Sequence, residues 1–133
     1  MAAGRYDFTI EQGATTNFEV QYQDSNENPI DLTDYQGRMQ IRPLVGSSTI
    51  HLTLSSSLGI CGTGINMSGS NGTTPPTSGS VGIYISAATS SMLDWDGNAY
   101  YDLEVYSGSN DCEYVVRLLQ GKVRLSKEIT LAR

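Results

Sequence analysis

The sequence predicts a single, mostly β domain, built as a sandwich or a barrel of short strands. Apolar and polar residues alternate over several short segments, which is the period of a half-buried strand. Clusters of Gly, Pro, Asn, Asp and Ser separate these segments. The chain has 133 residues, of which 17% are charged and eight are Tyr. This composition fits one folded domain spanning 1–133 better than a disordered chain.

The first half of the chain alternates in four segments. A turn cluster, Asp24 to Pro29, separates the second segment from the third. The connection that follows the cluster is too short for a helix, so we expect Ile30 and Leu32 to plug the edge of the core. Pro43 ends the third segment, because proline cannot donate to a strand ladder. The four predicted strands are 6–11, 17–23, 36–42 and 49–54.

A low-complexity segment interrupts the middle of the chain. Residues 68–80 are nearly all Ser, Gly, Thr, Asn and Pro, so we expect an exposed loop there. Before it, 58–61 and 65–67 are predicted to form a short strand pair around glycines. After it, 81–85 resumes the alternation of a strand.

The chain is predicted to end with a short helix and a long hairpin. Ser86 is the expected N-cap, and Leu93 and Trp95 are expected to pin the helix to the core. Gly121 is expected to allow a bulge. The helix is predicted over 86–93 and the two hairpin strands over 99–106 and 112–125.

The charge of the chain argues against two classes of partner. The net charge is −6 and the sequence pI is about 4.5. An acidic chain has no electrostatic footprint for nucleic acid, and an anionic membrane surface would repel it. We find no apolar secretory region at the N-terminus and no apolar stretch long enough to span a bilayer. Most of the positive charge lies near the C-terminus, either on a solvated strand face, which we favour, or at a contact with an acidic neighbour.

Residues suited to catalysis or cofactor binding are few. His51 is the single histidine, and the alternation places it on the exposed face of its strand. Cys61 and Cys112 are far apart in sequence, and we expect two reduced thiols packed as small hydrophobes. The sequence therefore predicts no enzyme, no transition-metal site and no cofactor.

One acidic segment imitates the start of a calcium-binding loop. Asp94, Asp96 and Asn98 have the spacing of the first ligands, but Ala99 stands where glycine is needed and Val105 where a bidentate Glu is needed. We interpret the segment as a turn. The segment of Asp24, Asn26 and Asn28 departs from the pattern in the same way.

The order of motifs along nearly the whole chain resembles small virion proteins of tailed phages, including phages of cyanobacteria. The run "YDFTIEQGATTNFEVQYQDSNENPIDLTDYQGRMQIRP" is similar to their N-terminal half, and "GIYISAATSSML", "YYDLEVYSG" and "VVRLLQGKVRLSKEIT" continue the likeness. The chain is also similar to the N-terminal modules of baseplate proteins. The resemblance implies an antiparallel, immunoglobulin-like β-sandwich without enzymatic activity. The loop over 68–80 is longer than in the simplest version of the pattern.

The resemblance implies a virion structural protein of the tail or baseplate, which bridges neighbouring subunits or attaches fibres. The expected partners are other virion proteins and further copies of the chain, and the expected location is the virion, assembled in the host cytoplasm. Terminal segments 1–4 and 127–133 are candidate arms that a neighbour would order. The candidate interaction residues are Arg5, Tyr6, Trp95, Arg124, Lys127 and Arg133.

Two alternative functions stay open at this point. A head decoration protein could clamp capsomers with the same fold. A carbohydrate-binding module could bind a host glycan through aromatic side chains, for which the candidates are Tyr84, Trp95, Tyr100 and Tyr106.

Overall fold

The fold is a sandwich-like arrangement of two β-sheets with one short helix. It is seen in a computed structural model that describes residues 4–69, 73, 75–108 and 112–129. The two sheets confirm the predicted mostly β class. The immunoglobulin-like topology within that class stays a prediction.

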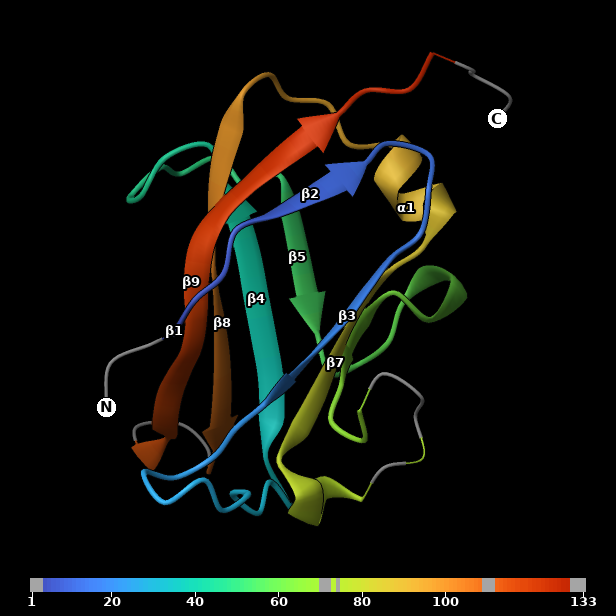
Figure 1. The fold of residues 1–133 in the computed structure, drawn as a ribbon. Helices are drawn as coiled ribbons and strands as arrows, with labels where there is room; N and C mark the ends of the chain where they lie inside the picture. Colours follow the sequence, from blue (N-terminus) through green and yellow to red (C-terminus); the bar gives the residue numbers. More distant parts are fainter. Residues whose placement is uncertain (1–3, 70–72, 74, 109–111, 130–133) are drawn as a thin grey trace.

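The large sheet has six strands in the order β1-β9-β8-β4-β5, with β2 also paired to β9. Its strands are β1 (Gly4–Arg5), β2 (Phe8–Glu11), β4 (Gln36–Arg42), β5 (Leu52–Ser55), β8 (Asn98–Ser107) and β9 (Tyr114–Ser126). The small sheet has the order β3-β7-β6. Its strands are β3 (Thr16–Gln21), β6 (Gly64–Asn66) and β7 (Ser80–Ile85). Figure 1 shows β3 crossing obliquely in front of β4.

The predicted closing hairpin is confirmed, but its bulge lies elsewhere. β8 and β9 pair antiparallel, and the register shifts between Leu103 and Glu104. Leu103 lies opposite Leu119, and Glu104 lies opposite Arg117, so Leu118 is the extra residue. The predicted bulge at Gly121 is therefore wrong: Gly121 lies in regular pairing with Tyr101.

Gly121 has a different role, because the N-terminal segment runs directly against it. β1 and β2 pair with the free edge of β9 in parallel, a departure from a purely antiparallel sandwich. A Cβ built on Gly121 would collide with the carbonyl oxygen of Tyr6 and would lie 2.7 Å from Asp7 Oδ1. Glycine is required here so that the two backbones can approach each other.

The core lies between the sheets, where inward residues from both meet. Met39, Ile41 and Leu103 come from the large sheet, and Ile65 and Ile83 from the small one; each is at most 1% exposed. Burying a side chain of this size contributes roughly 1.5–3 kcal/mol. The plug predicted before β4 is confirmed, since Leu32 is buried and Ile30 is partly buried.

The predicted helix is confirmed as α1 (Ala87–Ser91), with Ser86 as its N-cap. The Ser86 hydroxyl accepts a hydrogen bond from the backbone N–H of Thr89. Thr63 Oγ1 lies 2.9 Å from Ser86 Oγ and 3.1 Å from Thr89 Oγ1, so three buried hydroxyls satisfy one another. Ser90 Oγ donates to the carbonyl of Ala14, which ties α1 to the loop before β3.

Three predictions for the middle of the chain need correction. The strand predicted over 49–54 is shorter, since β5 begins at Leu52 and Ile50 is 43% exposed. Only the second half of the predicted short pair is a strand, because 60–62 forms a 3₁₀ turn with Cys61 at φ 53°. Both cysteines are exposed rather than packed, because each lies in or beside a turn and neither belongs to a strand.

The end of the predicted loop over 68–80 is more ordered than expected. Pro76–Ser78 forms a second 3₁₀ turn, and Ser80 is the first residue of β7. Gly79 has φ 70°, and a Cβ there would lie 2.5 Å from the carbonyl oxygen of Tyr22. Residues 70–72 and 74 lie outside the described residues.

Replacing Gly121 with alanine tests the close approach of the N-terminal segment. We expect Gly121→Ala to lower the free energy of unfolding by about 1–3 kcal/mol, because the new methyl group overpacks against backbone. Gly59→Ala is the control, since a Cβ at Gly59 meets only an ordinary contact at 3.7 Å. Urea unfolding of both variants measures the difference, and equal stabilities would contradict the role given to Gly121.

Candidate functional site

Polar side chains interact from strand to strand on the outward surface of β4, β8 and β9. We call this surface the outer face. The register aligns its side chains in rows across the three strands. The rows are Gln36–Tyr106–Val115, Arg38–Glu104–Arg117, Gln40–Asp102–Gln120 and Arg42–Tyr100–Lys122. Arg124, opposite Asn98, follows on β9.

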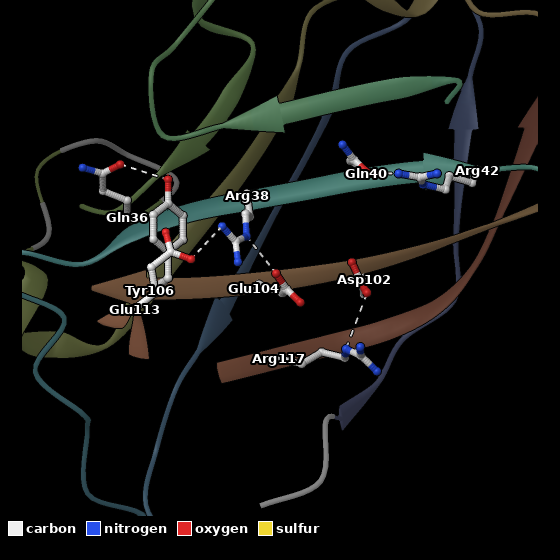
Figure 2. Close-up of polar contacts among 9 residues, drawn as sticks. All are labelled: Gln36, Arg38, Gln40, Arg42, Asp102, Glu104, Tyr106, Glu113 and Arg117. Atoms are coloured by element: carbon white, nitrogen blue, oxygen red, sulfur yellow. Dashed lines mark hydrogen bonds and ion pairs between the residues drawn. The ribbon is translucent and has the colours of Figure 1, made fainter. Parts of the chain in front are cut away.

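The middle rows of the outer face are charge-balanced (Figure 2). Arg38 Nε donates to Glu104 Oε1 at 2.8 Å, and its Nη1 lies 3.5 Å from Glu113 Oε1. The hydrogen bond that Arg38 donates to Glu104 raises the pKa of Arg38. Arg117 Nε lies 3.5 Å from Asp102 Oδ2. Arg38 and Arg117 are therefore paired with carboxylates of their own chain.

Tyr106 contacts two side chains of the outer face, Arg38 and Gln36. The Arg38 guanidinium lies 4.4 Å from the centre of the Tyr106 ring, a cation–π contact. The Tyr106 hydroxyl donates to Gln36 Oε1 at 3.0 Å. The aromatic ring is thus covered by the guanidinium, which leaves its near face unavailable to a sugar.

The other end of the outer face carries cations that make no ion pair with a carboxylate of the described residues. Arg42 donates to Gln40 Oε1 at 2.6 Å and to the carbonyl of Ser47, both neutral acceptors. Among the described residues, no carboxylate lies within 4 Å of the charged groups of Arg42, Lys122 or Arg124. We call these three residues the basic end.

A groove of about 830 Å³ runs over the outer face and reaches the basic end. Five of the chain's eight Lys and Arg residues line it, but only two of its fourteen Asp and Glu residues do. The groove therefore carries a formal charge of +3, and the rest of the chain carries −9. Leu44 and Val45, 64% and 88% exposed, lie in the loop after β4 and also line the groove.

Asp102 is a carboxylate whose ionised form is disfavoured by its position on the outer face. Burial raises the pKa of Asp102, and the negative charge of Glu104 raises it further. The cations Arg117, Arg42 and Arg38 lower it by less, so the pKa stays above its ordinary value.

The structure separates the candidate interaction residues that the sequence predicted. Arg5 lines the groove and pairs with Asp7 at 3.5 Å, and Arg124 belongs to the basic end. Tyr6 is 44% exposed and lies against Phe8 and Phe18. Arg133 lies outside the described residues, as do residues 1–3 and 130–132 of the candidate arms.

Trp95 is part of the core rather than a surface platform. It is only 7% exposed, as expected from its role in pinning α1. His51 stacks on it, with ring centroids 4.7 Å apart, so His51 is half-buried and not the exposed strand residue predicted. The alternation failed here because His51 precedes β5 and turns toward the tryptophan.

Lys127 is bound within the chain instead of extending as an arm. Its Nζ lies 2.8 Å from Asp94 Oδ1 and 3.0 Å from Asp96 Oδ1. The hydrogen bond from Lys127 lowers the pKa of Asp94. The two carboxylates that imitate a calcium loop thus face a lysine ammonium.

Comparison with protein-family models and with curated proteins finds no match to this chain. In the part of the chain that the structure describes, no group of three or more His, Cys, Asp or Glu residues is placed to hold a metal ion. Within the same part, no helix has the length and apolar character needed to cross a membrane.

Neutralising Asp102 tests the electrostatics of the outer face. Its pKa is higher in the folded chain than in the unfolded one, so ionisation opposes folding, and stability falls as pH rises from about 4 through the raised pKa. We therefore expect Asp102→Asn to be more stable than the native chain at pH 7 and to lose this pH dependence. The lost pairing with Arg117, a partly exposed residue, is a small opposing effect.

The matched control for this prediction is Asp94→Asn. The pKa of Asp94 is lowered in the folded chain, so its ionised form favours folding. Neutralising Asp94 therefore reduces stability at neutral pH, whereas neutralising Asp102 increases it. Thermal unfolding between pH 3 and pH 7 distinguishes the two variants. Equal loss of stability in both at pH 7 would contradict the account of Asp102.

Proposed function

We propose that this chain is a virion structural protein of a tailed phage, a tail or baseplate component that bridges neighbouring subunits. The single observation that supports it best is the uneven charge of the surface. The groove over the outer face carries +3 on a chain whose net charge is −6, and the three cations of the basic end make no ion pair within 4 Å with a carboxylate of the described residues. Such a surface suits contact with an acidic protein neighbour.

The motif order along the chain also supports this proposal. Its likeness to small virion proteins of tailed phages is independent of the charges on the outer face. A bridging subunit needs only modest contacts, because the symmetry of a particle repeats each of them many times.

The head decoration protein is the alternative that uses the same surface. Decoration proteins coat a capsid in far more copies than a tail component has, so copy number separates the two. The carbohydrate-binding alternative loses one of its four candidates, because Trp95 is buried, and the Arg38 guanidinium covers one face of the Tyr106 ring.

Purified particles of a phage that encodes this chain provide the test. We expect mass spectrometry to detect the chain in gradient-purified virions, and a cryo-EM map to fit its two-sheet sandwich in the tail or baseplate. Density covering the head at high copy number would favour the decoration protein. Absence of the chain from the particles would overturn the proposal.

A further inference from the structure

The basic end has an acidic counterpart within the same chain. The turn over residues 24–34 contains four carboxylates and no Lys or Arg. We call this segment the acidic turn; its carboxylates belong to Asp24, Glu27, Asp31 and Asp34. Among the described residues, none of these four carboxylates makes an ion pair within 4 Å, just as the cations of the basic end make none.

The acidic turn is held in a fixed shape. Asp24 Oδ1 accepts hydrogen bonds from the backbone N–H groups of Asn26 and Asn28 at 2.8 and 3.0 Å. Asp31 Oδ1 accepts from the backbone and the hydroxyl of Thr33, which lowers the pKa of Asp31. A bridge between Gln23 and Pro29 closes the base of the turn. The carboxylates of Asp24 and Asp31 are therefore presented without a large loss of conformational entropy on binding.

The two charged segments lie at opposite ends of β4. The acidic turn ends at Asp34, two residues before β4 begins at Gln36. Arg42, at the basic end, is the last residue of β4. Seven residues at roughly 3.3 Å each put the ends about 20 Å apart. Figure 1 shows the blue turn at one end of the sandwich and the loop after β4 near the other. One chain cannot bring its own turn to its own basic end.

We infer that the basic end of one copy binds the acidic turn of a second copy, head to tail. This deepens the proposed function, on which it rests, by naming the neighbour that the outer face contacts. Arg42, Lys122 and Arg124 would face the carboxylates, and the exposed Leu44 and Val45 would supply apolar contact beside them. Because the two surfaces differ, the contact is heterologous and builds a ring or an open row of subunits.

Sedimentation velocity of the purified chain is the first test. We expect concentration-dependent association in about 10 mM salt and dissociation in about 1 M salt, because the Debye length falls from about 30 Å to about 3 Å. A native chain that stays monomeric at low salt would overturn the inference, whatever other acidic protein it bound.

Charge-reversed variants locate the contact. Lys122→Glu/Arg124→Glu reverses the charge of the basic end, and Glu27→Lys/Asp34→Asn reduces the formal charge of the acidic turn from −4 to −1 while leaving the hydrogen-bonded Asp24 and Asp31 intact. We expect each variant alone to associate at least about tenfold more weakly than the native chain. Association as strong as that of the native chain in either variant would overturn the inference.

A mixture of the two variants distinguishes a head-to-tail contact from lost folding or altered net charge. The first variant keeps a native turn and the second keeps a native basic end, so one contact forms and the 1:1 mixture should give a discrete heterodimer. No heterodimer would overturn the inference. Arg124→Glu alone is compared with Lys127→Glu, which has the same net charge; equal weakening would likewise overturn it.

The two proposals can fail separately. Presence of the chain in virions together with a monomeric chain in solution overturns only the head-to-tail contact. Association through the two segments, together with absence from virions, overturns only the proposed virion role.

Discussion

The outer face depends on one irregularity in the pairing of β8 with β9. Side chains alternate along a strand, so an extra residue moves every later side chain to the opposite face. Leu119, Gly121, Val123 and Leu125 face the core. In an unbroken strand the next odd-numbered residue, Arg117, would face the core as well. The bulge at Leu118 turns Arg117 outward, where it meets Asp102.

The same strand also closes the fold at its other edge. β9 is the longest strand, and without β1 and β2 it would present an unpaired edge, a ready template for unwanted strand pairing. Tyr101 anchors this closure, since its hydroxyl donates to the carbonyl of Tyr6 at 2.5 Å. Gly121 makes room for the same backbone. The edge is thus covered within the chain, and the proposed contacts between copies use charged side chains rather than strand addition.

Much of the fold could be predicted from the sequence, because it is recorded in local patterns. Alternation located β3, β4, β8 and β9 closely, and the capping chemistry of Ser86 located α1. The parallel pairing of β1 with β9 could not be predicted, because it joins residues more than 100 positions apart and no turn sets its register. The bulge was expected at a glycine, yet its position follows from the packing of Leu118 and Leu119, which are both buried.

The candidate site was harder to predict than the fold. Arg124 was predicted from the sequence as an interaction residue. A contact with an acidic neighbour was one interpretation of the basic residues near the C-terminus. Arg42 was not predicted, because no local sequence pattern indicates that Arg42 and Lys122 lie in the same row, two strands apart. Lys127 was assigned to an arm, although two carboxylates some thirty residues earlier hold it. Rows across a sheet depend on register, which the single sequence does not contain.

The register of β8 and β9 is therefore the feature to measure. Nuclear Overhauser contacts between backbone protons of the two strands report directly which residues lie opposite each other. We expect contacts that pair Leu103 with Leu119, Glu104 with Arg117 and Val105 with Val116, with Leu118 unpaired. Contacts that pair Glu104 with Leu118 and Val105 with Arg117 would show an unbroken ladder. That result would turn Arg117 toward the core and contradict the charge arrangement on which the outer face rests.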